Sequence, residues 1–205
     1  KLIFWELELE NIDDQAMIEI LESQKAEANS QFGKFIERNY EDWFEPKADK
    51  PILSHQLFRE LVVPEIVKKE KPILFVVIDN LRYDQWKVFE NVIGNHYKLE
   101  KEVPYYSILP TATQYARNAI FSGLTPLEME KQFPQYWKND PDEGGKNLIK
   151  DKFLTAHLKR LGLNIKQDYY KITNLAGGKK LVENFKTLKD NDLVTVVYNF
   201  VDMLS

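Results

Sequence analysis

The stretch that decides the fold is Pro72-Ile-Leu-Phe-Val-Val-Ile-Asp79, a run of six apolar residues that ends in an aspartate. A second run, Leu193-Val-Thr-Val-Val-Tyr-Asn-Phe-Val-Asp202, has the same character. Strands this apolar are typical of sheets covered on both faces, and open sheets of that kind bind ligands beyond the carboxyl ends of their strands. We therefore expect two buried strands, at 73–78 and 193–201, with both aspartates at one functional edge.

The rest of the chain from residue 72 onward alternates between strand and helix patterns. The sequence predicts a short strand at 105–109 and helices at 82–93, 114–121, 127–132, 148–161 and 178–188. A loop is expected through 140–145. This alternation predicts an α/β domain with a mostly parallel sheet.

The N-terminal segment has a different, helical pattern. Apolar residues recur at helical spacing from Met17 to Phe44 after the acidic pair Asp13-Asp14, which indicates a helix of about 30 residues. A helix this long with one apolar stripe needs partner helices. We expect residues 1–70 to form part of a helical bundle, with a third helix capped by Ser54 and interrupted near Pro64.

Composition narrows the chemistry. The 205 residues are 43% hydrophobic, enough for one core with a helical appendage. Without cysteine the chain has no disulfides or thiolate metal sites, which fits the cytoplasm, and no apolar stretch is long enough for membrane insertion. A metal must use oxygen or histidine, and none of the three histidines lies within four residues of Asp79 or Asp202.

Charge is distributed unevenly along the chain. The net charge is −4, but residues 1–50 hold 13 acidic and 6 basic residues. The lysines near the other end, at 179, 180, 186 and 189, have an ordinary density and favour a solvated helix face over a nucleic-acid surface. The chain begins at Lys1 within a helical pattern and ends at Ser205 just after a buried strand, so we expect a piece of a larger protein.

Asp79 has two interpretations. It could cap the helix that follows, where an aspartate accepts backbone N–H bonds. It could instead bind a metal, and Asp202 strengthens that interpretation, because two carboxylates at one sheet edge repel each other unless a cation lies between them.

Thr113 also has two interpretations. Either it or Thr111 could cap the helix predicted at 114–121. Alternatively, its hydroxyl is a nucleophile, which needs an activator at neutral pH; without a nearby histidine base, a metal ion is the natural one. The sequence contains no phosphate-binding glycine loop, no G-x-S-x-G motif and no H-E-x-x-H motif.

Several motifs together resemble a known family. The segments Asp79-Asn-Leu-Arg-Tyr-Asp84 and Ser107-Ile-Leu-Pro-Thr-Ala-Thr-Gln-Tyr-Ala-Arg-Asn-Ala-Ile-Phe-Ser-Gly-Leu124 are similar to the PglZ domain of PorX-type response regulators of Bacteroidetes. That domain belongs to the alkaline phosphatase superfamily, whose nucleotide pyrophosphatase branch has a similar Pro-Thr-x-Thr turn. The resemblance covers residues 71–205, and residues 1–70 resemble the end of the three-helix bundle that follows the receiver domain in those proteins.

The resemblance implies a fold and a site. The fold is an alkaline phosphatase-like, mostly parallel sheet with helices on both faces, preceded by part of a helical bundle. By position, the nucleophile matches Thr113 and a zinc ligand matches Asp79. Asp202 matches the aspartate of an Asp-x-x-x-His pair whose histidine would be residue 206. About half of a two-zinc site is therefore present, and residues 1–205 alone are expected to be inactive and to bind zinc weakly or not at all.

The resemblance also implies a cellular role. It predicts the effector of a cytoplasmic two-component response regulator that controls type IX secretion, with a zinc-dependent phosphodiesterase-like hydrolase acting on nucleotides or oligonucleotides. The implied partners are a sensor histidine kinase, a sigma factor or secretion-system protein, and a second copy of the full-length protein in a homodimer.

Two alternatives remain open. The chain could be a non-catalytic signalling module that binds a partner, with a structural or vestigial metal site. A haloacid dehalogenase-type phosphatase with Asp79 as nucleophile is a weaker alternative, because that chemistry needs an aspartate at position 81, which is leucine.

Overall fold

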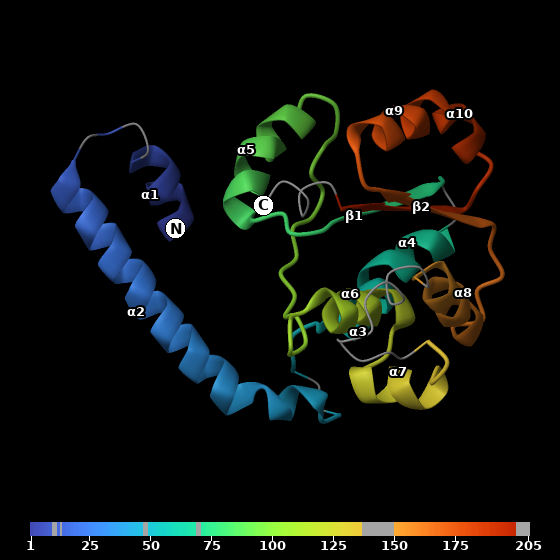
Figure 1. The fold of residues 1–205 in the computed structure, drawn as a ribbon, viewed down its shortest axis with the longest axis horizontal. Coiled ribbons are helices and arrows are strands. Elements are labelled where there is room, and N and C mark those ends of the chain that lie inside the picture. Colours follow the sequence, from blue (N-terminus) through green and yellow to red (C-terminus); the bar gives the residue numbers. More distant parts are fainter. Residues whose placement is uncertain (10–11, 13, 47–48, 69–70, 137–149, 200–205) are drawn as a thin grey trace. The chain divides into compact units, whose positions relative to one another are not determined.

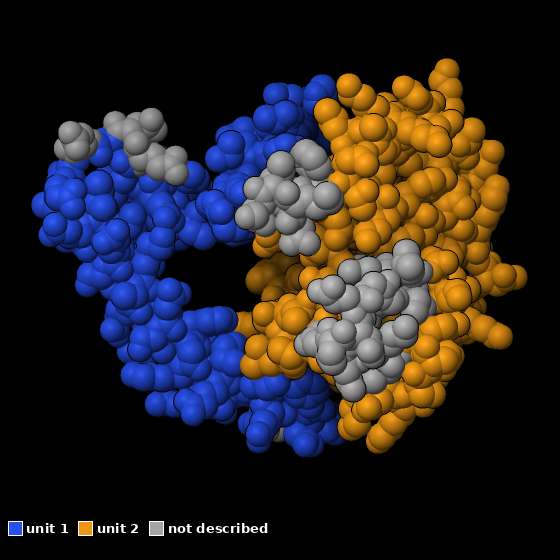
Figure 2. Space-filling view, in the orientation of Figure 1, with its two compact units in different colours: residues 1–50, 81–102 blue, residues 51–80, 103–205 orange. Residues whose placement is uncertain are grey.

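The computed structural model describes residues 1–9, 12, 14–46, 49–68, 71–136 and 150–199. The chain forms two compact units, one of residues 1–50 and 81–102 and the other of residues 51–80 and 103–205 (Figure 2). In the described part of the chain, no helix is both long and apolar enough to cross a membrane.

The first unit is helical, as the N-terminal pattern predicts. It contains α1 (Leu2–Leu9), α2 (Gln15–Asn39), the 3-10 turn Glu41–Phe44 and α5 (Tyr83–Ile93) (Figure 1). The side chain of Asp14 accepts a 3.1 Å hydrogen bond from the backbone N–H of Met17, so Asp14 is the N-cap of α2. Only Leu21 and Trp43 are buried among the described residues of this unit, which leaves much of the apolar stripe of α2 exposed.

The second unit is built on a three-stranded parallel sheet in the order β1-β3-β2. Its strands are β1 (Ile73–Ile78), β2 (Gln167–Ile172) and β3 (Leu193–Tyr198). Ile73 pairs with Leu193 and Ile78 pairs with Tyr198, so β1 and β3 end at the same level of the sheet. The predicted parallel α/β sheet is therefore confirmed.

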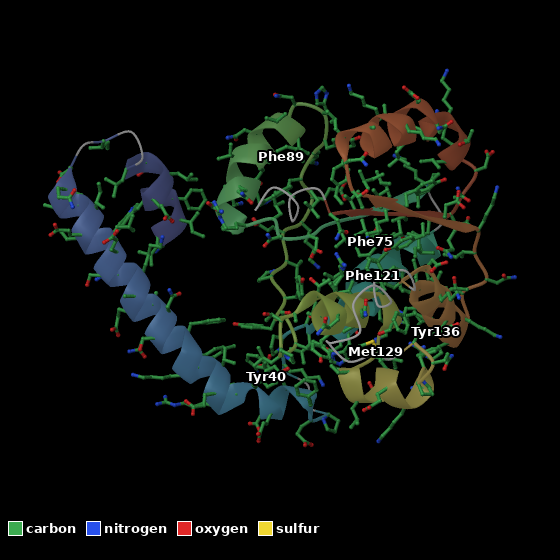
Figure 3. The ribbon with its side chains drawn as sticks, viewed as in Figure 1. Tyr40, Phe75, Phe89, Phe121, Met129 and Tyr136 are labelled. Atoms are coloured by element: carbon green, nitrogen blue, oxygen red, sulfur yellow. The ribbon has the colours of Figure 1, made fainter. Side chains whose placement is uncertain are left out.

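Helices lie on both faces of this sheet (Figure 1). On one side are α9 (Leu175–Glu183) and α10 (Phe185–Leu188), and on the other are α4 (Val63–Lys68), α6 (Thr113–Ser122) and α8 (Lys150–Arg160). On that second side the ring of Phe75 in β1 packs on the rings of Phe58 and Phe121, with centroids 5.6 and 6.2 Å away (Figure 3). These aromatic contacts attach α6 to the sheet.

The two apolar strands differ in burial, and the prediction of a buried strand at 73–78 is wrong on one face. β3 is central and its residues Leu193–Val197 are all buried. β1 is an edge strand, and its Leu74 and Val76 are 46% and 44% exposed. Their register partners, Val194 and Val196, are covered by Leu181 and Leu188 of the two helices on that face. Within the second unit, the helical cover on this face stops short of β1.

The strands in the middle of the chain differ from the prediction in two places. β2 was not predicted, because its sequence Gln-Asp-Tyr-Tyr-Lys-Ile lacks an apolar run. The expected strand at 105–109 is reduced to a single parallel bridge between Tyr106 and Leu53. The bridge consists of two backbone hydrogen bonds to the residues on either side of Leu53. Tyr106 N donates to Ile52 O, and Ser54 N donates to Tyr106 O.

The helix after residue 53 also departs from its prediction. Ser54 is not its cap: the helix α3 (Ser54–Leu57) has Leu53 at its N-cap, and the Ser54 hydroxyl accepts a 3.1 Å bond from the backbone N–H of Ile108. The expected interruption near Pro64 is present as a π-helical segment, Phe58–Val62, just before α4. A wider turn accommodates the missing N–H and the ring of a proline inside a helix.

The remaining helices match their predictions with shifted bounds. α7 (Pro126–Gln132) begins at a Thr125 N-cap, whose hydroxyl accepts from the backbone N–H of Glu128. The helix expected at 178–188 begins earlier and is divided into α9 and α10. The strand expected at 193–201 ends earlier, at Tyr198. The start of the helix expected at 148–161, the loop at 140–145 and residues 200 and 201 lie outside the described residues.

Candidate functional site

Asp79 leaves the sheet at the carboxyl edge of β1. Its backbone N–H donates a 2.9 Å hydrogen bond to the carbonyl of Tyr198, which continues the pairing of β1 with β3 by one residue. The next residue, Asn80, has a φ of +61°, a left-handed conformation that asparagine tolerates better than most residues. This residue turns the chain away from the sheet immediately after the carboxylate.

The capping interpretation of Asp79 is wrong. The helix that follows, α5, has Arg82 at its N-cap. The Asp79 carboxylate instead forms an ion pair with Nη1 of Arg117, a residue of α6 that is only 4% exposed. A buried guanidinium is stable only when it is paired, so this contact anchors α6 to the edge of the sheet.

Asn199 completes a closed arrangement around this ion pair. It directly follows β3, as Asp79 directly follows β1, and it is buried. Its Oδ1 accepts a 3.2 Å bond from Arg117 Nη1, and its Nδ2 donates a 3.4 Å bond to Asp79 Oδ2. Arg117 and Asn199 therefore both donate to the same oxygen of Asp79.

Thr113 is the first residue of α6, and the capping interpretation of both threonines is wrong. The N-cap is Ala112, and no side chain caps this end of the helix. Thr113 precedes Arg117 by four residues, and residues with this spacing lie on the same face of a helix. The face of α6 that carries Thr113 is therefore the one that Arg117 joins to Asp79.

The other end of α6 is also anchored. Nδ1 of the buried His157 lies 3.1 Å from the carbonyl oxygen of Phe121, and Arg160 donates from Nη2 to the carbonyl of Ser122. A carbonyl only accepts, so the Nδ1 of His157 carries the hydrogen. Burial, together with the positive charge of Arg160, lowers the pKa of His157 to about 4. A neutral imidazole therefore holds this end of the helix.

The described residues supply only part of a metal site. Asp79 fits as one ligand, because its side chain is 17% exposed and the hydrogen bonds of its carboxylate to described residues use Oδ2, which leaves Oδ1 for a cation. Within the described ranges, no three His, Cys, Asp or Glu residues gather in a metal-binding group. Asp202, the other predicted ligand, lies outside them.

Sequence reasoning did not identify Arg117 or Asn199. Both lie within segments that it used, since Arg117 is in the Ser107–Leu124 motif and Asn199 is in the second apolar run. The spacing from Thr113 to Arg117 and the position of Asn199 opposite Asp79 were the available signals. A polar residue inside an apolar run, three positions before the final aspartate, indicates a buried hydrogen-bonding role.

Comparison with known proteins supports the family resemblance. Residues 57–205 match the family model of the BREX system PglZ alkaline phosphatase-like domain. Residues 1–44 match the model of the PorX response regulator linker domain. A search of curated proteins gave no match.

Proposed function

Because the chain belongs to the PglZ family of alkaline phosphatase-like domains, and its first 44 residues match a PorX response regulator linker, we propose that it is the effector part of a cytoplasmic two-component response regulator. Its enzymatic activity is zinc-dependent phosphodiester hydrolysis, with nucleotides or oligonucleotides as substrates. Alkaline phosphatase-like proteins generally use metal ions, and the complete protein holds two zinc ions in this proposal.

The proposed organisation and partners rest on the same resemblance. Residues 1–70 form part of the bundle linker, and residues 71–205 form the N-terminal portion of the phosphatase-like domain. A sensor histidine kinase acts on a receiver domain of the complete protein, which forms a homodimer. Its output controls type IX secretion through a sigma factor or a secretion-system protein.

One observation carries the enzymatic proposal. The ion pair of Arg117 with Asp79 attaches the first turns of α6 to the carboxyl edge of the sheet. Open α/β sheets bind their ligands at this edge. The arrangement brings the helix face with Thr113 to the same edge as a carboxylate that keeps one oxygen available.

The proposed chemistry assigns a role to each residue. Asp79 and Asp202 would hold zinc, which would supply a Lewis acid that activates the Thr113 hydroxyl and offsets phosphoryl charge. The proton of the Thr113 hydroxyl passes to solvent, and Thr113 Oγ1 attacks phosphorus in line. A phosphorus–oxygen bond forms as the bond to the leaving oxygen breaks, and that oxygen takes up a proton from water. Water then hydrolyses the covalent threonine phosphodiester, which releases the phosphomonoester product and restores the hydroxyl.

The test is the Thr113→Ala variant of the complete protein, assayed with a nitrophenyl phosphodiester. We expect a loss of at least a hundred-fold in kcat/KM, because a covalent step without its nucleophile leaves only the uncatalysed attack of water. Thr111→Ala, two residues earlier and outside the helix, is the matched control and should retain activity. Unchanged hydrolysis by Thr113→Ala contradicts the nucleophile assignment.

A second function is a non-catalytic signalling module that binds a partner protein. The observation in its favour is that Asp79 forms an ion pair with Arg117, a contact that a purely structural role would also need. A zinc titration of the complete protein separates the two functions, because undetectable zinc binding favours the signalling module.

A further inference from the structure

The carboxylate of Asp79 has two oxygens with different surroundings. Arg117 Nη1 and Asn199 Nδ2 both donate to Oδ2. None of the side-chain hydrogen bonds within the described residues reaches Oδ1. The carboxylate is thus oriented by one oxygen while the other remains available to a ligand.

Asn199 fixes this orientation because its amide is engaged at both ends. Its oxygen accepts from Arg117, so its nitrogen is directed at Asp79. The three side chains come from the end of β1, the end of β3 and the second turn of α6. Such a closed ring of buried hydrogen bonds leaves little freedom for the carboxylate to rotate.

Within this ring, the charges of Asp79 and Arg117 offset each other. Asp79 contributes one negative charge and Arg117 one positive charge, while Asn199 is neutral. A divalent cation at Oδ1 therefore meets a carboxylate whose charge is already offset by a guanidinium on its other oxygen. Two like charges held by one carboxylate in a protein repel strongly enough to change an affinity by about an order of magnitude.

We propose that Arg117 is an internal counter-cation that positions Asp79 and sets a low affinity of the site for divalent cations. The inference rests on the proposed function, since it takes Asp79 as a metal ligand. A cation binds through Oδ1, against the repulsion of Arg117, and the guanidinium keeps Asp79 folded against the sheet when no cation is bound. Removing the charge of Arg117 while keeping a hydrogen-bond donor strengthens cation binding.

The experiment measures the zinc affinity of the complete protein by competition with a chromogenic chelator at fixed pH and ionic strength. We expect Arg117→Gln to bind zinc about ten-fold more tightly or better, and Arg117→Lys, which keeps the charge, to stay within about three-fold of the wild type. If Arg117 has a purely structural role, both variants should bind zinc more weakly than the wild type. Unchanged or weaker binding by Arg117→Gln overturns the proposal.

Asp79→Asn separates this inference from the proposed function. If zinc binding is the same in Asp79→Asn and wild type, Asp79 is not a ligand and both proposals fail. If Asp79→Asn loses zinc while Arg117→Gln binds like the wild type, only the counter-cation role fails.

A measurement on the wild type covers the case in which Arg117→Gln does not fold. The guanidinium N–H signal of Arg117, assigned in nitrogen–proton NMR spectra by its absence from Arg117→Lys, should shift as zinc is added. A signal that is unaffected at saturating zinc overturns the proposal.

Discussion

The imidazole of His157 occupies the space where a side chain at Gly123 would begin. A β-carbon added to Gly123 would lie 2.2 Å from His157 Nε2, well inside contact distance. Gly123 also has a φ of +63°, in the left-handed region that glycine adopts without strain. Glycine is therefore required here twice, once by the backbone that ends α6 and once by the histidine that packs on it.

Gly123→Ala should consequently lower the free energy of unfolding of the second unit by more than the cost of backbone strain alone. Alanine at positive φ costs about 1 kcal/mol, and displacing a buried ring adds to this. Gly162→Ala is the matched control, because Gly162 has a φ of +70° with nothing within 4 Å of its added β-carbon. Urea unfolding of both variants checks the difference, and equal losses would contradict the close packing of His157.

His157 should make the protein sensitive to mild acid. Its pKa is lowered to about 4 in the folded chain, mainly by burial. The folded state therefore binds this proton only at a lower pH than the unfolded chain, in which a histidine has a pKa of about 6.5. The stabilising contribution is complete above pH 6.5 and is lost as the pH falls toward 4, for a change on the order of 3 kcal/mol.

The variant that checks this is His157→Gln, which keeps a donor for the Phe121 carbonyl but does not titrate. Its free energy of unfolding should vary less between pH 4 and pH 6.5 than that of the wild type. His96→Gln, at an exposed histidine, serves as control and should preserve the wild-type pH dependence. A pH profile that is identical in His157→Gln and wild type contradicts the prediction.

Val76 and Val196 are register partners on neighbouring strands, but their substitution should have unequal effects. Val196 is 3% exposed and Val76 is 44% exposed. Val196→Ala should cost about 2 kcal/mol by removing buried methyl groups, whereas Val76→Ala should cost about 0.5 kcal/mol or less. Chemical denaturation of the two variants measures the difference, and a comparable loss for Val76→Ala would mean that this face of β1 is covered.

The sequence predicts strands β1 and β3 but not β2, and the reason is physical. β1 and β3 were predictable because burial in a parallel sheet demands a continuous apolar run, which is visible in one chain segment. β2 was missed because it lies at the other edge of the sheet, where polar residues such as Gln167 and Lys171 are tolerated. The exposed face of β1 was equally unpredictable, since it depends on where helices from distant segments pack.

In the candidate site, local sequence patterns likewise identify some residues and not others. Asp79 and Thr113 were identified as the ends of local elements, and the structure places both at element ends. Arg117 and Asn199 contact Asp79 across 38 and 120 residues of sequence. Such contacts leave no periodic pattern in the sequence, so the partners of a carboxylate become known only when the fold is known.

The strand order has a consequence for synthesis of the protein. Every residue of β1 pairs with a residue of β3 that lies 120 positions further along the chain. Because the N-terminal part of a protein leaves the ribosome first, β1 emerges long before the strand that pairs with it, and contacts of such large sequence separation form slowly. Until β3 arrives, the apolar run that ends in Asp79 lacks the strand with which it pairs in the fold, and exposed apolar segments of this kind favour aggregation.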